Sequence, residues 1–216
     1  IATALGGRKE AERQFRTCAW SSPGGLGPLV GVEVRLVLLR DPEQVSALLV
    51  EDPAATMIVT ARIPEHGGAW RKSLDERERL LLGAAGKGAW IDLEWPQSLG
   101  IDVAAAQRIV SFHDVGGVPV DLGRIVGAIE SCAAIRRKIA VTPHTYRELA
   151  GLGDLGLRLP PATTILAMGE LGVANRWRSW FEGVTERLIY TFLESPMAPG
   201  QLAFADVLNM PRSVAT

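Results

Sequence analysis

The residue with the clearest chemical potential is Lys138, in the middle of an apolar segment. Residues 139–141 are apolar and Pro143 ends the run, so the pattern predicts a short buried strand. Side chains alternate along a strand, which puts Lys138 on one face with Ala140 and Thr142. Such neighbours remove hydration and lower the pKa of a lysine, and a neutral amine is what Schiff-base formation with a ketone requires. From this segment alone, a lysine that extends to solvent is the alternative.

A histidine and a pair of oppositely charged residues also lie on predicted strands. His113 closes the apolar segment 108–113, where a neutral imidazole would be a good general base, although it could equally be a hydrogen-bonded core histidine. Glu33 and Arg35 share one face of another predicted strand. They could hold the hydroxyls of a polyol substrate or form a structural ion pair.

Other polar residues also cluster near predicted strand ends. Arg62 and Glu94 each end a strand, and we interpret Glu94 and its neighbour Asp92 mainly as acceptors for nearby cations. Gly67-Gly68 is either a simple turn or a place where backbone approaches a ligand closely. The segment 197–201, Met-Ala-Pro-Gly-Gln, follows the last predicted strand and is suited to a lid.

The elements that must position these residues alternate regularly. Strands are predicted at 1–5, 30–39, 57–62, 89–94, 108–113, 136–143, 163–168 and 188–192. Helices are predicted at 8–20, after Asp41, after a Ser73–Glu76 capping box, and at 103–107, 121–131, 146–149, 173–181 and 204–208. This alternation predicts a parallel sheet closed as a (β/α)8 barrel, in which chemistry gathers at the carboxyl ends of the strands. A doubly wound open sheet is the competing topology, and it is disfavoured because no glycine-rich turn follows the first predicted strand.

Composition limits the classes of function. We expect a single domain spanning residues 1–216, alone or as one part of a longer multifunctional chain. The formal charge of -1 offers no global case for a nucleic-acid or anionic-membrane partner, and no apolar run is long enough to span a bilayer. Cys18 and Cys132 have no metal-ligand spacing and are expected to be reduced, which favours a cytoplasmic protein.

Together these segments resemble the type I 3-dehydroquinate dehydratases, the Schiff-base-forming class of the shikimate pathway. The resemblance covers residues 30–208 and depends on the order of several short motifs rather than on any one. The motifs are Glu33-Val34-Arg35, Thr60-Ala61-Arg62 with Gly67-Gly68, Ile91-Asp92-Leu93-Glu94, Ser111-Phe112-His113-Asp114, Lys138-Ile139-Ala140-Val141-Thr142, Met168-Gly169-Glu170-Leu171-Gly172-Val173 with Arg176, and Ala198-Pro199-Gly200-Gln201.

The resemblance implies roles for individual residues. Lys138 would be the Schiff-base lysine, His113 the acid and base, and Arg176 the anchor of the substrate carboxylate. Further substrate contacts would come from Glu33, Arg35, Arg62 and Gln201. The implied reaction removes water from 3-dehydroquinate to give 3-dehydroshikimate, without metal or cofactor. The partner is then the small-molecule substrate, and a homodimer is the assembly we consider.

Three positions depart from the family pattern. His66 stands where the family has a glutamate that pairs with the histidine base, with Glu65 one position earlier. Met197 replaces a serine of the lid, with Ser195 two residues before it, and Val37 replaces an aspartate. These substitutions could reduce the activity. Two alternatives therefore stay open: a barrel that binds or regulates without efficient turnover, and another lysine-dependent enzyme such as an aldolase.

Overall fold

A parallel sheet organises the chain. The computed structural model describes residues 2–3, 31–39, 41–45, 56–181, 188–192, 196 and 198–209. Seven strands form the sheet in chain order: β1 (Ala2–Thr3), β2 (Gly31–Arg35), β3 (Thr56–Thr60), β4 (Trp90–Glu94), β5 (Arg108–Asp114), β6 (Arg136–Val141) and β7 (Thr163–Ala167). All of their pairings are parallel, so their carboxyl ends share one edge.

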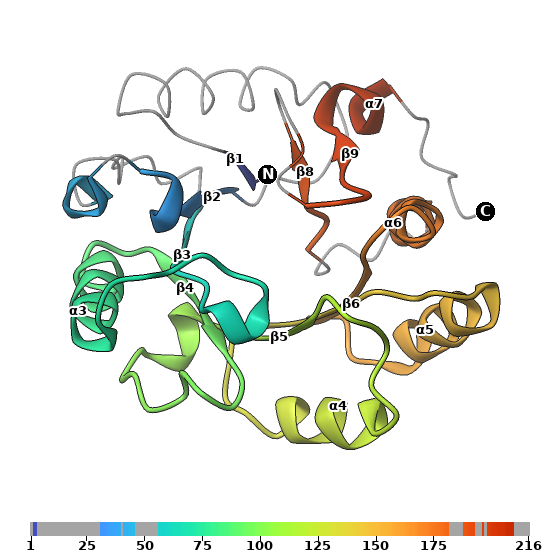
Figure 1. Cartoon of the computed structure of the whole chain (residues 1–216), viewed down its shortest axis with the longest axis horizontal. Helices are drawn as coiled ribbons and strands as arrows, with labels where there is room; N and C mark the ends of the chain where they lie inside the picture. Colours follow the sequence, from blue (N-terminus) through green and yellow to red (C-terminus); the bar gives the residue numbers. More distant parts are fainter. Residues whose placement is uncertain are drawn as a thin grey trace.

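Helices pack on the outer side of this curved sheet (Figure 1). They are α3 (Leu74–Ala85), α4 (Leu122–Glu130), α5 (Tyr146–Arg158) and α6 (Gly172–Phe181). Two apolar clusters fill the space between the layers. In one, Leu81 of α3 packs with Val34 and Ile91; in the other, Ile129 of α4 packs with Ile139 and Val141. Burial of this apolar surface holds the helices against the strands.

A third apolar cluster lies on the opposite face of the sheet and supports the site. It contains Ile58, Ile109, Ala140, Leu166, Met168, Leu188 and Tyr190. Side chains alternate along β6, so Lys138 and Ala140 face this inner side while Ile139 and Val141 face the helices. The predicted lysine strand and its two faces are therefore confirmed.

Several predicted boundaries differ from the structure. The strand predicted at 30–39 ends at Arg35, and Leu36–Leu38 forms a 3-10 helix (η1). The helix predicted at 103–107 is only the 3-10 turn Ala105–Gln107 (η4). Helix α5 begins where predicted, at a capping box of Thr145 and Glu148, but extends nine residues past its predicted end. The predicted Ser73 cap is confirmed, since its side chain accepts from the Glu76 N–H.

Some predictions fall outside the described residues. The helix predicted at 8–20 lies there, and so does most of the helix after Asp41, of which the 3-10 turn Pro42–Gln44 (η2) is described. Near the end of the chain, β8 (Thr191–Phe192) pairs in parallel with β9 (Leu202–Ala203), which was not predicted, and α7 (Phe204–Asn209) follows.

The architecture is an α/β fold built on a parallel sheet. Its strand order follows the chain without reversal, so the doubly wound alternative is wrong. The expected eightfold barrel is reproduced in part, because no described backbone ladder joins β8 to β7 or to β1. Among the described residues, no helix has both the length and the apolar character needed to cross a membrane.

Candidate active site

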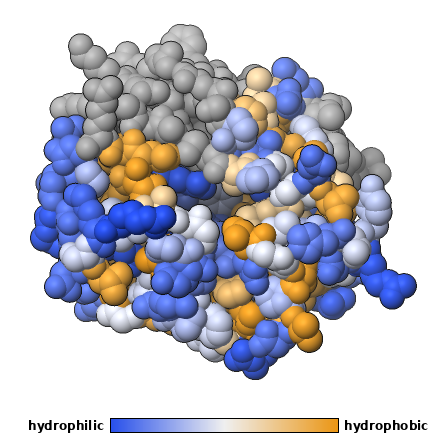
Figure 2. All heavy atoms as spheres, in the orientation of Figure 1, coloured by the Kyte–Doolittle hydropathy of each residue, from blue (hydrophilic) through white to orange (hydrophobic). Residues whose placement is uncertain are grey.

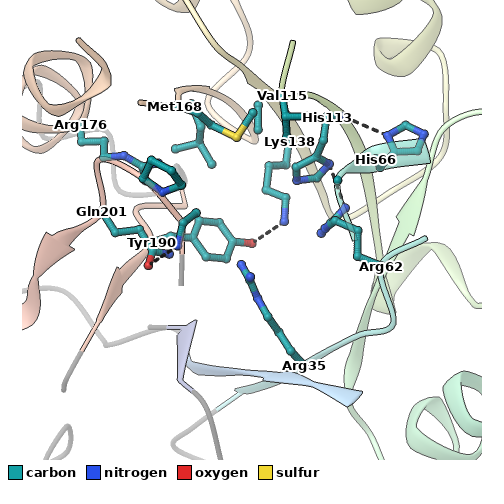
Figure 3. A pocket seen from close by; sticks show the side chains of 15 residues that line it. Arg35, Arg62, His66, His113, Val115, Lys138, Met168, Arg176, Tyr190 and Gln201 are labelled. Atoms are coloured by element: carbon teal, nitrogen blue, oxygen red, sulfur yellow. Dashed lines mark hydrogen bonds between the residues drawn. The ribbon is translucent and has the colours of Figure 1, made fainter. Parts of the chain in front are cut away.

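A pocket of about 170 Å³ lies where the parallel strands end and the inner apolar cluster meets solvent. In the orientation of Figure 1, the surface is hollowed near the middle of the face (Figure 2). Its chemically reactive lining comes from elements far apart in the sequence: Arg35, Arg62, His66, His113, Lys138, Arg176, Tyr190 and Gln201 (Figure 3). The structure thus brings most of the predicted site residues together around one cavity.

Lys138 lies at the floor of the pocket and is 3% exposed. Its Nζ donates to Oδ2 of Asp92, with which it forms a buried ion pair, and to the phenol oxygen of Tyr190 at 3.3 Å. Burial lowers the pKa of Lys138, and Arg62 lowers it further, although Asp92 opposes both effects. The amine is therefore closer to its neutral, nucleophilic form than an exposed lysine.

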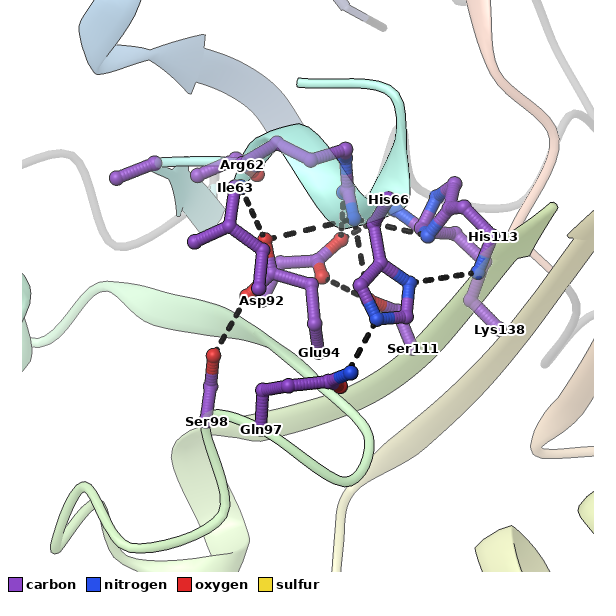
Figure 4. A network of polar contacts seen from close by, with 12 residues as sticks. Arg62, Ile63, His66, Asp92, Glu94, Gln97, Ser98, Ser111, His113 and Lys138 are labelled. Carbon is purple, nitrogen blue, oxygen red and sulfur yellow. Dashed lines mark hydrogen bonds and ion pairs between the residues drawn. The ribbon is translucent and has the colours of Figure 1, made fainter. Parts of the chain in front are cut away.

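Asp92 is the hub of the network beneath the pocket (Figure 4). It is fully buried and accepts hydrogen bonds from Ser111 Oγ, Lys138 Nζ and, at 3.0 Å, Arg62 Nη2. Burial alone would favour the neutral acid, but Arg62 and Lys138 hold the pKa of Asp92 well below its usual range. Asp92 is therefore a permanent anion, as predicted for a structural acceptor.

His113 is held neutral beside this network. Its Nδ1 lies 2.8 Å from Nη1 of Arg62 and must accept, because a guanidinium only donates; the ring proton is therefore on Nε2. Burial, Arg62 and Lys138 lower the pKa of His113 well below its ordinary value. A neutral imidazole suits a base, but its Nδ1 lone pair is occupied by Arg62.

His66 supports the backbone of His113 rather than its ring. Its Nδ1 accepts from the His113 N–H at 3.1 Å, so its Nε2–H donates to Gln97 Oε1 at 3.0 Å. The two imidazole rings lie 6.2 Å apart at 85°. The site therefore lacks a carboxylate at position 66, and Glu65, which could have replaced it, is exposed and does not line the pocket.

The glycine pair after His66 makes this turn possible. Gly67 has φ +72°, in the left-handed region, and ends the 3-10 turn Pro64–His66 (η3). A Cβ at Gly68 would lie 2.0 Å from the carbonyl oxygen of Arg62. Of the two alternatives for this pair, a turn or a close approach to a ligand, the structure shows the turn, and the close approach of Gly68 is to the backbone of Arg62.

Glu33 and Arg35 are paired, but only Arg35 lines the pocket. Glu33 is buried, and its carboxylate accepts from Arg35 Nε at 3.1 Å and from Thr60 Oγ1 at 2.8 Å. Burial opposes its charge, yet Arg35 and Lys138 lower the pKa of Glu33 to about 2. Glu33 thus positions Arg35 from beneath and adds negative charge near Lys138.

Arg176 presents a buried guanidinium to the same pocket. It projects from α6, is 3% exposed, and its Nε and Nη1 atoms have no hydrogen-bond partner among the described residues. Burial lowers the pKa of Arg176 to about 10, so it stays protonated at neutral pH. A buried, unpaired cation is costly, and an anionic ligand would offset that cost.

The predicted lid contributes Gln201. Its side-chain Oε1 accepts from the Ala198 N–H at 3.2 Å, and Gly200, with φ +77°, places its Cα against the carbonyl of Gly169. The two further lid candidates, Ser195 and Met197, lie outside the described residues.

The sequence analysis missed Tyr190. This residue precedes β8, is buried in the inner apolar cluster, and lines the pocket with its phenol against Lys138. Its alternation with Leu188 in the predicted strand 188–192 was the available signal, since both share the inner face. In the described part of the chain, no His, Cys, Asp and Glu side chains form a group of three or more that could hold a metal ion.

Comparisons with known proteins find one family, the type I 3-dehydroquinases. Residues 31–214 match the family model of type I 3-dehydroquinase. A 3-dehydroquinate dehydratase of Methanothrix thermoacetophila is 31% identical over 184 residues, covering 82% of this chain and 78% of the relative. One from Methanothermobacter thermautotrophicus is 30% identical over 178 residues, covering 79% of each.

Solved structures show the same fold. The 3-dehydroquinate dehydratase of Geobacillus kaustophilus aligns with a TM-score of 0.70 and 21% identity, covering 95% of this chain and 86% of that one. A type I enzyme from Clostridium difficile, solved with covalently modified comenic acid, aligns with a TM-score of 0.69 and 21% identity, covering 96% and 90%.

Proposed function

Because the chain belongs to the type I 3-dehydroquinase family, we propose that it converts 3-dehydroquinate to 3-dehydroshikimate through a Schiff base on Lys138. The observation that carries the proposal is that one pocket holds both a buried lysine amine and a buried guanidinium. Lys138 has a lowered pKa and can attack a ketone, while Arg176 has unpartnered donors suited to a carboxylate. A small keto acid satisfies both.

The Schiff base makes the elimination easier. The amine of Lys138 adds to the C3 ketone, and loss of water gives an iminium that withdraws electrons from C2. A C2 proton then leaves, the C1 hydroxyl departs as water, and hydrolysis of the imine releases the product and the amine. One difficult elimination is thus divided into easier steps.

His113 carries the protons of the elimination. It removes the C2 proton as a base and returns a proton to the departing C1 hydroxyl. Substrate oxygens that enter the pocket compete for the Arg62 guanidinium, and release of Nδ1 by Arg62 frees the His113 lone pair. The 2.8 Å contact between Arg62 Nη1 and His113 Nδ1 must therefore break before Nδ1 acts as the base.

The remaining residues bind the substrate. Arg176 holds the carboxylate, Arg35 and Arg62 hold hydroxyls, and Gln201 closes the lid over them. Glu33 acts by fixing Arg35, with Ser195 a further candidate from the lid. We also propose that residues 1–216 form one (β/α)8 domain, since Leu188 and Tyr190 pack with the residues of the inner face of the sheet. Cytoplasmic location, supported by the free thiol of Cys132, and a homodimer complete the proposal.

A second candidate is a barrel that binds the substrate without efficient turnover. The observation that favours it is the loss of a carboxylate beside His113, whose Nδ1 is bound by Arg62 instead. Reduced dehydratase activity is the intermediate case.

Borohydride trapping of the Schiff base distinguishes the dehydratase from the binding barrel. Reduction in the presence of 3-dehydroquinate should add the substrate mass to the peptide bearing Lys138, and Lys138→Ala should abolish this labelling. Lys72→Ala is the matched control, because Lys72 is an exposed lysine of the surface pair with Glu76. Labelling with formation of the conjugated enone supports the dehydratase, and labelling without it supports the binding barrel. An unmodified Lys138 in folded, substrate-saturated protein excludes both Schiff-base readings.

A further inference from the structure

Tyr190 is placed against the reacting nitrogen of the proposed mechanism. It is 6% exposed and packs in the inner apolar cluster, with Lys138 Nζ 4.6 Å from the centroid of its ring. The same Nζ donates a hydrogen bond of 3.3 Å to the phenol oxygen (Figure 3). The lysine is thus held by the oxygen and by the face of one tyrosine.

The hydrogen of the Tyr190 phenol is free to point into the pocket. The Tyr190 oxygen already accepts from Nζ, and among the described residues none accepts the phenol hydrogen in return. Because Tyr190 lines the pocket, a ligand oxygen bound beside Lys138 is the natural acceptor. The arrangement Nζ–H, phenol oxygen, phenol hydrogen and ligand oxygen then forms a continuous chain of hydrogen bonds.

The surroundings keep this phenol protonated. Burial and the carboxylates of Glu33 and Asp92 raise the pKa of Tyr190 well above its ordinary value. A free phenolate is therefore disfavoured, which suits a group that passes a proton on as it receives another.

The first step of imine formation needs such a group. When the amine adds to a ketone, the nitrogen gains positive charge and the oxygen gains negative charge, so a proton must move from nitrogen to oxygen. Among the described residues, two side chains hydrogen-bond to Nζ: Asp92, a carboxylate held as an anion with no proton to give, and Tyr190. His113 is not one of these partners of Nζ, since its described ring contact is with Arg62. Tyr190 alone of these groups combines an acceptor for the nitrogen proton with a proton to donate.

We propose, resting on the Schiff-base function above, that Tyr190 is a catalytic residue of imine formation, whose phenol relays a proton from Lys138 Nζ to the substrate carbonyl oxygen. The C–N bond forms with the nitrogen lone pair as the C=O π electrons move to oxygen. One nitrogen proton passes to the phenol oxygen while the phenol proton passes to the new alkoxide. The product is a neutral carbinolamine and an unchanged tyrosine.

The relay runs backward when the imine is hydrolysed. Collapse of the carbinolamine returns a proton from its hydroxyl through Tyr190 to the nitrogen of Lys138. Imine formation and product release should therefore both depend on the phenol, whereas removal of the C2 proton should not.

Tyr190→Phe tests the relay because it removes one oxygen and keeps the ring against Lys138. Rapid-quench borohydride trapping should show the rate of Lys138 labelling falling on the order of 100-fold, the range of one proton-transfer group. Exchange of the substrate ketone oxygen with labelled water should slow in parallel. KM should change little compared with kcat, since the packing is retained. Tyr146→Phe is the matched control, because Tyr146 is 79% exposed and is the other of the two tyrosines in the chain.

A measurement on the unaltered protein makes the test independent of folding of the variant. Trapping rates in mixtures of light and heavy water should depend on the deuterium fraction as expected for two protons moving together. Labelling of Tyr190→Phe at the unaltered protein's rate, or a one-proton dependence, overturns the relay and leaves the Schiff base of Lys138 intact. Absence of labelling in the unaltered protein overturns both.

Discussion

Replacing His66 by glutamate tests how the site manages without a carboxylate beside His113. The His66 ring is neutral and faces the ring of His113 at a centroid distance of 6.2 Å. Around His113, the nearby cations Arg62 and Lys138 favour the neutral imidazole. Asp92 is the anion that opposes them, and a carboxylate at position 66 would add a second negative charge on the side of the His66 ring.

The magnitude follows from the distance. Two unit charges about 6 Å apart in an effective dielectric of about 20 attract by about 3 kcal/mol. A pKa unit corresponds to about 1.4 kcal/mol, so His66→Glu should raise the pKa of His113 by about 2 units. The sign is upward because a nearby anion favours imidazolium. A stronger base should also increase turnover, on the order of tenfold at neutral pH.

The assay is an NMR titration of the histidine ring protons together with a pH profile of kcat. The chain has three histidines, so the variant leaves His113 and His144 to assign. His66→Gln is the control, because an amide can keep hydrogen bonds without adding charge. It should leave the pKa of His113 near its present low value.

The reasoning is refuted if His66→Glu and His66→Gln give the same His113 titration in folded protein. That result would mean that the new carboxylate turns away from the pocket, as the exposed Glu65 does now. A raised pKa without a gain in turnover would instead locate the limiting step outside proton abstraction.

Two further predictions concern charges. Arg176→Ala should raise KM for 3-dehydroquinate about 10- to 100-fold, because one charge-assisted hydrogen-bonding group is worth about 1.5–3 kcal/mol. Steady-state kinetics checks this prediction, with Arg178→Ala as the control because Arg178 is a partly exposed arginine of the same helix that does not line the pocket, and an unchanged KM for Arg176→Ala contradicts the prediction. The pKa of Glu33 is lowered from 4.5 to about 2, so its stabilisation is complete above about pH 4.5 and is lost as the pH falls toward 2, about 3 kcal/mol in all. Urea unfolding at pH 7 and pH 3 should show a smaller acid loss in Glu33→Gln, and an equal loss contradicts the assignment.

Local sequence patterns predicted much of the scaffold. The period-2 alternation around Lys138 separated its inner face from the outer face of Ile139, because side chains in a strand alternate whatever surrounds them. The apolar segments ending in Arg62 and His113 likewise indicated which strand ends meet, since parallel strands share a carboxyl edge. These inferences need only neighbouring residues, and the residues that they singled out line the pocket.

Contacts between residues far apart in the sequence could not be predicted from local patterns. The Arg62 bond to Nδ1 of His113 joins residues 51 apart, and the Tyr190 contact with Lys138 joins residues 52 apart. Residue types alone left Glu33 either as a ligand of substrate hydroxyls or as half of a structural ion pair, and only the tertiary structure shows that it is buried and paired with Arg35. Hydrogen bonds depend on tenths of an ångström and on which lone pair is already occupied. Those quantities are set by how the sheet curves and packs. The chain order of the motifs therefore predicted which side chains line the pocket, while folding determined their hydrogen-bond partners.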